Sequence, residues 1–98
     1  MADITIADLK QRQQAGETLH ILDVRETWEN EESRIPGSQN IPLNELPNKL
    51  DDLEELKEQE VIVHCKSGAR SATAKAFLTQ QGFTNVRNLL GGMMAYQA

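Results

Sequence analysis

Apolar and polar positions follow each other along the chain in blocks that predict short strands separated by helices. Residues 19–24 and 61–64 are brief and largely apolar, which is typical of strands buried on both faces of a sheet. Shorter strands are predicted at residues 40–41 and 86–89. Helices between such strands require right-handed crossovers. The pattern therefore predicts the α/β class, with a small, mostly parallel sheet of about five strands and helices on both faces.

Local signals place the helices between these strands. Thr5 followed three residues later by Asp8 is a capping pattern, so the first helix is predicted over residues 6–15. A short helix is predicted over residues 26–32. The last predicted helix covers residues 70–81, where a glycine can supply a left-handed stop.

Five leucines spaced three or four residues apart predict an amphipathic helical segment before the strand at residues 61–64. The acidic side chains between them would form its solvated face. Pro47 lacks the N–H group that a helix interior needs and fits only a first turn, so two helical pieces are expected rather than one. The leucines are Leu43, Leu46, Leu50, Leu53 and Leu56.

Length, charge and cysteine content exclude several classes of protein. The 98 residues allow a single domain, residues 1–98. With 15 acidic and 10 basic residues the net charge is −5, which disfavours a nucleic-acid partner. No apolar run approaches the roughly 20 residues of a membrane helix and no signal-peptide pattern is present, so a cytoplasmic protein without a membrane partner is expected. The single cysteine and the spacing of the histidines indicate neither disulfide nor metal site, and no cofactor is expected.

The candidate chemistry follows the strand at residues 61–64 directly. Ligands of parallel sheets bind beyond the carboxyl ends of the strands, and here that position holds Cys65, shortly before the next predicted helix. We call residues 65–70 the cysteine loop. Its serine and glycine allow successive amide N–H groups to turn inward, and the following helix adds the positive end of its dipole.

These features predict that Cys65 is a catalytic nucleophile whose pKa lies below the usual value of about 8.5. The rest of the loop and the serine after it are predicted to bind the substrate, and that serine could also donate a hydrogen bond to the sulfur. The alternative is an inert buried thiol, because isolated cysteines after core strands are often packing residues. The predicted substrate-binding residues are Lys66, Ser67, Gly68, Ala69, Arg70 and Ser71.

Charged side chains near the loop have predicted supporting roles. Arg70 either contacts the substrate or braces the cysteine loop by pairing with Asp23 or Glu26. Bracing is favoured, because arginine grips carboxylates with two hydrogen bonds and the strand that carries Asp23 should lie beside the strand before the loop. Arg25 is the alternative occupant of the cleft.

Other side chains near the loop are predicted to be structural or peripheral. His64 precedes Cys65, but neighbouring strand residues point to opposite faces, so we expect a half-buried strand residue rather than a base. Trp28 is expected to pack or to line the cleft. Lys66 either attracts an anionic substrate or faces the solvent. The glycines at residues 91–92 are expected to form a turn.

Four segments, in order and over essentially the whole chain, resemble the rhodanese family of sulfurtransferases. The segment around Cys65 reads His-Cys-x-x-Gly-x-Arg-Ser, similar to the family's active-site loop. Arg34 stands where the family usually has His, Tyr96 stands for its C-terminal Trp, and the chain ends at Ala98, earlier than in many relatives; these departures concern substrate preference. The other segments are Leu-Asp-Val-Arg-Glu at residues 22–26, Ile-Pro-Gly-Ser at 35–38 with Asn-Ile-Pro at 40–42, and Gly-Phe at 82–83 with residues 89–92.

The resemblance implies a rhodanese-like fold and a sulfurtransferase of the thiosulfate:cyanide type. Cys65 would take a sulfane sulfur from a donor such as thiosulfate or a persulfide, and would pass it to cyanide or a thiol. Asp23 and Arg25 would support the site. Thioredoxin-like or sulfur-carrier proteins are implied as partners.

Two alternatives stay open. The first is a non-catalytic persulfide relay or binding module. The second is a phosphatase or arsenate reductase, since cell-cycle phosphatases share the fold. Their loop resembles Cys-x5-Arg, whereas four residues separate Cys65 from Arg70 here, and the shorter ring favours sulfur.

Overall fold

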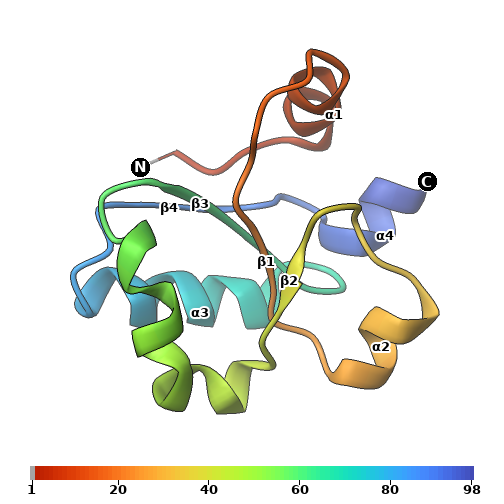
Figure 1. The fold of residues 1–98 in the computed structure, drawn as a ribbon. Helices are drawn as coiled ribbons and strands as arrows, with labels where there is room; N and C mark the ends of the chain where they lie inside the picture. Colours follow the sequence, from red (N-terminus) through yellow and green to blue (C-terminus); the bar gives the residue numbers. More distant parts are fainter. Residues whose placement is uncertain (1) are drawn as a thin grey trace.

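A parallel sheet of four strands lies at the centre of the structure, a computed structural model that describes residues 2–98 (Figure 1). The strand order is β2-β1-β3-β4, and every neighbouring pair is parallel. The prediction of about five strands is therefore wrong by one. Next to β4 the N-terminal segment adds a single bridge, between Ile4 and Leu89, rather than a strand. The strands are β1 (Ile21–Asp23), β2 (Gln39–Asn40), β3 (Glu60–His64) and β4 (Asn85–Asn88).

Helices cover both faces of the sheet, as predicted. In Figure 1, α3 and η1 lie on one side of the strands, and α1 and α4 lie on the other. Two apolar clusters fill the spaces between these layers, one around Leu46, Leu78 and Val63, the other around Leu9 and Ile62. The helices are α1 (Ile6–Gln14), α2 (Thr27–Glu32), η1 (Leu43–Leu56), α3 (Ala69–Gln80) and α4 (Gly92–Gln97).

The central strand β3 explains why the core has two halves. Its successive side chains point to opposite faces, so Val61 and Val63 enter the cluster under α3 and η1, while Ile62 enters the cluster under α1. Cys65 continues the first set, directly beyond the strand. The apolar pattern that predicted a doubly covered strand therefore also determines the face from which the cysteine is reached.

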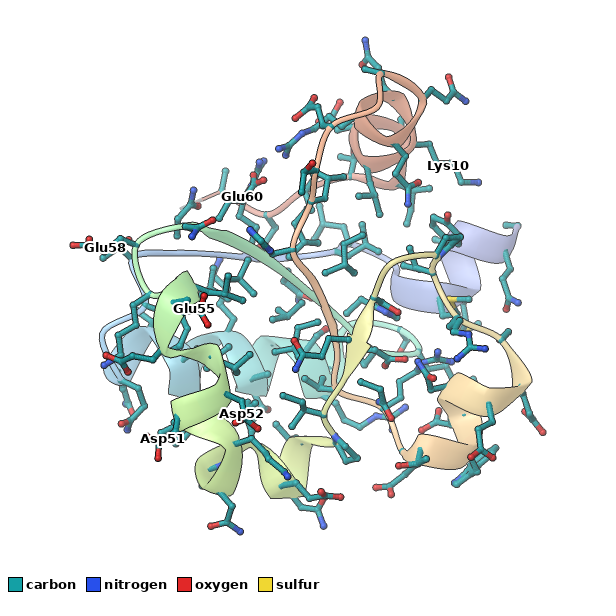
Figure 2. The ribbon with its side chains drawn as sticks, in the orientation of Figure 1. Lys10, Asp51, Asp52, Glu55, Glu58 and Glu60 are labelled. Atoms are coloured by element: carbon teal, nitrogen blue, oxygen red, sulfur yellow. The ribbon has the colours of Figure 1, made fainter. Side chains whose placement is uncertain are left out.

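The segment with the leucine stripe differs from its prediction. It forms one run of 3-10 helix over Leu43–Leu56, with Pro47 inside it, and the expectation of two pieces is wrong. In an α-helix the proline ring would press against the carbonyl four residues earlier, which disfavours α-helical turns around Pro47. Leu46 and Leu53 are buried, and Asp51, Asp52 and Glu55 extend into the solvent (Figure 2).

The remaining elements apart from α4 lie close to their predicted positions. Helix α4 was not predicted, and Gly92, which was expected in a turn, is its first residue. The side chain of Thr5 accepts a hydrogen bond from the backbone N–H of Asp8, which caps α1 as expected. Strand β1 is shorter than its apolar run, and β2 begins one residue early. Among residues 2–98, none of the helices combines the length and apolar composition that crossing a bilayer requires.

Candidate active site

Cys65 stands immediately beyond β3, with its side chain 1% exposed. Gly68 adopts a left-handed conformation with φ of +118°, which turns the chain so that α3 begins beside the sulfur. The backbone N–H of Gly68 donates to Sγ at 3.1 Å, and Oγ of Ser71, in the first turn of α3, lies 3.3 Å from Sγ. The loop and the helix N-terminus thus surround one sulfur atom.

The electrostatics of this position favour a thiolate. Burial raises the pKa of the Cys65 thiol, but hydrogen bonding with the Ser71 side chain and with the backbone N–H groups of Ser71, Gly68 and Ser67 outweighs burial and holds the pKa below its usual value. This direction agrees with the prediction from the loop. A buried sulfur with a lowered pKa and several hydrogen-bond donors around it is suited to nucleophilic chemistry.

The six predicted substrate-binding residues take different places. Ser67 and Gly68 present backbone N–H groups to the sulfur, and Ser71 presents its side chain. Lys66 lines a neighbouring cleft. The other two are the first residues of α3: Ala69, which is exposed, and Arg70, whose side chain turns away from the sulfur toward α2.

Arg70 pairs with a carboxylate, but with one that was not predicted. Its Nη1 and Nη2 donate to Oε1 and Oε2 of Glu29 at 2.6 and 3.0 Å. Hydrogen bonding from Arg70 also holds the pKa of Glu29 below its usual value. The predicted pairing of Arg70 with Asp23 or Glu26 is wrong, because Asp23 is already bound by Arg25 and the first turn of α2 brings Glu29 to α3 instead.

Asp23 and Arg25 form a buried pair at the end of β1. Nε and Nη2 of Arg25 donate to the two carboxylate oxygens of Asp23 at 3.0 and 2.8 Å, and Nη2 also donates to the carbonyl of Ser33. Burial raises the pKa of Asp23, but the hydrogen bonds from Arg25 and Asn30 outweigh it and hold the pKa low. The pair therefore carries little net charge and ties β1 to the segment after α2.

His64 is more deeply buried than predicted. The expectation of a half-buried residue is wrong, because α1 and α4 cover the face of β3 to which the ring points. Its Nε2 lies 4.0 Å from Oδ2 of Asp23, and burial holds the pKa of His64 below its usual value. The ring stands on the face of the sheet opposite Cys65, which agrees with the expectation that it is no base for the sulfur.

A cleft of about 180 Å³ opens beside the cysteine loop. Trp28 forms part of its wall and is 60% exposed, as expected of a cleft residue. The charged residues that line the cleft have both signs, with Lys66 and Arg25 facing Glu29 and Glu32, and Met93 and Met94 of α4 bring apolar surface. No cluster of three or more His, Cys, Asp and Glu side chains within residues 2–98 is placed to hold a metal ion.

Comparison with known proteins identifies the family. A family model described as Rhodanese-like domain matches residues 5–98. The chain belongs to the rhodanese-like domain family. The prediction from the four sequence segments is therefore confirmed, as is the α/β rhodanese fold apart from its strand count.

Several relatives of this rhodanese-like domain are named sulfurtransferases. The chain is 39% identical over 95 residues to "Putative sulfurtransferase YtwF" of Bacillus subtilis, a match that covers 97% of this chain and 89% of that one. It is 34% identical over 94 residues to "Sulfurtransferase" of Allochromatium vinosum, covering 96% and 86%. A solved structure named human single domain sulfurtransferase TSTD1 superposes with a TM-score of 0.84 at 25% identity, covering 97% of this chain and 94% of that one. These names support a transferase of the rhodanese family.

Two asparagines complete the site of this rhodanese-like domain and were missed by the sequence analysis. Asn88 ends β4 and hydrogen-bonds both Ser71 and the carbonyl of Gly68. Asn30, on α2, donates to Oδ2 of Asp23 at 2.9 Å. Asn88 had a usable signal, since it is a polar residue at the carboxyl end of a predicted strand, where ligands of parallel sheets bind. Asn30 had none, because an asparagine on an exposed-looking helix is unremarkable in sequence.

Proposed function

We propose that this chain is a sulfurtransferase that carries a sulfane sulfur on Cys65, taking it from an anionic donor such as thiosulfate and passing it to a thiol or cyanide. The observation that carries the proposal is the surrounding of Sγ. The sulfur is buried beside the first turn of α3, accepts the N–H of Gly68, and has a lowered pKa. Membership of the rhodanese-like domain family supports the same chemistry.

The first half of the reaction loads the cysteine. The Cys65 thiolate attacks the outer sulfur of thiosulfate, and a new S–S bond forms as the bond between the two donor sulfurs breaks. Sulfite leaves with the bonding electron pair, and the negative charge moves to the outer sulfur of a Cys65 persulfide. The inward N–H groups of the cysteine loop hold this charge without reorganising, as preorganised donors do.

The second half unloads it. A thiolate or cyanide attacks the outer sulfur, takes it up as a persulfide or thiocyanate, and returns the electron pair of the broken bond to Cys65 as a thiolate. The protein alternates between the free Cys65 thiolate and the Cys65 persulfide, and sulfite leaves before the acceptor reacts, so ping-pong kinetics are expected. Lys66 at the cleft attracts the anionic donor, and the exposed Trp28 and Met94 leave room for a protein-borne thiol, from a thioredoxin-like or sulfur-carrier partner.

Phosphatase chemistry is disfavoured by the position of Arg70. A phosphate in the loop needs the guanidinium as a two-pronged donor. Here both of its outer nitrogens are engaged by Glu29, and the sulfur is surrounded closely by loop atoms. Hydrolysis of an aryl phosphate that is lost in Cys65→Ser would contradict this argument.

The intact mass of the reduced protein, before and after incubation with thiosulfate, tests the proposal. The native protein is expected to gain one sulfur atom, which cyanide then removes as thiocyanate. Cys65→Ser is expected to gain nothing, because an alcohol at this site cannot form the persulfide. As a matched control, Ser38→Ala changes a residue outside the site and should load like the native protein.

Failure has two distinguishable forms. No sulfur gain in the native protein, with Cys65 still alkylated quickly near neutral pH, contradicts thiosulfate transfer and favours the persulfide relay. If Cys65 is also alkylated slowly, thiosulfate transfer and the persulfide relay are both contradicted, and an inert buried thiol is favoured.

A further inference from the structure

The hydrogen bonds around Ser71 determine which way its single hydroxyl proton points. Oγ of Ser71 has three polar neighbours: Oδ1 of Asn88 at 2.6 Å, the carbonyl of Gly68 at 3.2 Å, and Sγ of Cys65 at 3.3 Å. A hydroxyl group donates one hydrogen bond only. The direction of that bond decides whether Ser71 supports the thiol or the thiolate of Cys65.

The orientation of the Asn88 amide resolves the direction. Nδ2 of Asn88 lies 3.2 Å from the carbonyl oxygen of Gly68, which can only accept. Turning the amide over would place Oδ1 against that carbonyl, two acceptors in contact, so Oδ1 must face Ser71. Because Oδ1 is also an acceptor, the short contact at 2.6 Å requires Ser71 to donate to Asn88.

In this arrangement the hydroxyl of Ser71 donates nothing to the sulfur, which keeps only the backbone N–H groups of Ser67, Gly68 and Ser71. Oγ can only accept from Cys65, which suits a protonated thiol, and the sequence-based expectation that Ser71 donates to sulfur holds only after the hydroxyl rotates. Rotation toward a thiolate leaves Oδ1 of Asn88 without a donor, and Asn88 is buried. The carbonyl of Gly68 is not affected, since it also accepts from the N–H of Ala72.

We propose that Asn88 is a positioning residue that holds the hydroxyl proton of Ser71 away from the Cys65 sulfur and releases it only against a competing negative charge on that sulfur. The proton moves by rotation of the hydroxyl alone, so no bond is broken. When the charge shifts to the outer sulfur of a persulfide, the proton returns to Asn88. The inference deepens the proposed function, on which its role in the transfer cycle rests.

The consequence is a thiolate that stays reactive. A thiolate that is stabilised more strongly is a weaker nucleophile, since nucleophilicity falls as the pKa of the thiol falls. Competition from Asn88 offsets part of the stabilisation that the loop provides. Other charged groups at this network are Arg70, whose charge acts on Cys65, and Asp3, which accepts the backbone N–H of Asn88 and pairs with Lys75.

Alkylation rates measured across pH test the inference, because Cys65 is the single cysteine and every alkylation event reports on it. The probe is iodoacetamide, applied to the native protein, Asn88→Leu, Ser71→Ala and the double variant. Asn88→Leu is expected to lower the apparent pKa by about one pH unit, the effect of one freed hydrogen bond. Its limiting rate at high pH is expected to fall about threefold, as a better stabilised thiolate reacts more slowly.

The double-variant comparison separates this role from a structural one. Ser71→Ala is expected to raise the pKa in the Asn88→Leu background and to move it much less in the native background. Asn85→Leu, on the same strand with an Oδ1 that makes no hydrogen bond, is the control and should match the native protein. Circular dichroism verifies folding of each variant.

Three outcomes would overturn the inference. The first is that Ser71→Ala raises the apparent pKa of Cys65 equally in the native and the Asn88→Leu backgrounds. The second is that the pKa of Cys65 is unchanged or raised in Asn88→Leu. The third is that Asn85→Leu lowers this pKa as much as Asn88→Leu does. If Asn88→Leu does not fold, Ser71→Ala in the native background is sufficient: a rise of a full unit in the pKa of Cys65 would overturn the inference. Alkylation needs no sulfur donor, so it tests the role of Asn88 separately from the proposed function. If the pKa of Cys65 shifts as expected but thiosulfate does not load the protein, the proposed function is contradicted and the role of Asn88 stands.

Discussion

His64 carries a titratable ring into the core of the sheet. The ring is fully buried, and neither of its nitrogens has a hydrogen-bond partner within residues 2–98. Burial lowers the pKa of His64 from its ordinary 6.5, and the nearby charge of Asp23 opposes this only in part. Burial of His64, the residue next to Cys65, therefore makes the fold less stable in acid.

Replacing this ring should change how stability depends on pH. Below about pH 6.5 the unfolded chain binds a proton at residue 64 that the folded chain refuses, so the free energy of unfolding of the native protein falls as the pH decreases toward 5. His64→Leu removes this contribution and the unpaired nitrogens, and its stability at pH 7 should lie within about 1 kcal/mol of native. Urea unfolding at pH 7, 6 and 5 measures the difference.

A second substitution controls for the volume that leucine leaves empty. His64→Phe keeps a ring in place without a titratable nitrogen, and it should show the same reduced pH dependence. Equal slopes for the native protein and both variants would show that the proton uptake occurs elsewhere.

Among the elements, α4 holds the cysteine loop in place. The N–H groups of Met93 and Met94, at its start, donate to the carbonyls of Cys65 and Lys66 at 2.9 Å each. The helix thus satisfies its first N–H groups with loop carbonyls, where other helices use a capping side chain. Gly92 makes this approach feasible, because a Cβ there would stand 2.6 Å from the carbonyl oxygen of Cys65.

Gly92→Ala tests the contact between helix and loop. It should destabilise the protein by about 2 to 3 kcal/mol, since the new methyl group meets backbone that cannot yield cheaply and φ is +56°. Displacement of the loop should also slow alkylation of Cys65. Gly16→Ala has a similar backbone penalty, with φ of +77°, but nothing lies within 4 Å of its Cβ. The two variants are compared by thermal unfolding and alkylation rate, and equal effects would refute the special position of Gly92.

At the scale of the molecule, ion pairs join elements that are distant in the sequence. Glu60 at the start of β3 accepts two hydrogen bonds from Arg12 of α1 and one from Arg87 of β4. In Figure 2, Glu60 lies at the α1 side of the sheet, apart from the acidic face formed by Asp51 and Asp52. Hydrogen bonding from Arg12 lowers the pKa of Glu60, more than burial raises it.

The lowered pKa of Glu60 predicts a stability that is lost in acid. Its contribution is complete above the unfolded value of about 4.5 and disappears as the pH falls through the lower folded value. Glu60→Gln should be less stable than the native protein by about 1 kcal/mol at pH 7 and should lose less between pH 4.5 and 3. Chemical denaturation at these pH values measures both. Glu58→Gln removes the same charge from an exposed position, and an equal loss there would contradict the assignment.

The sequence by itself determined the features that depend on local pattern. Apolar runs of strand length, capping signals and glycine stops placed the helices and strands other than α4 to within a few residues, and the order of strand, cysteine loop and helix located Cys65. These features follow from backbone geometry and side-chain period, which neighbouring residues settle among themselves. The family followed from motifs of the same local kind.

Only the tertiary structure decided which distant side chains meet. It paired Arg70 with Glu29 and set Asn88 against Ser71, and it ended the sheet at four strands. It also enclosed His64 completely. Each of these depends on which segments lie side by side and how far a side chain reaches, and a periodic pattern does not encode either.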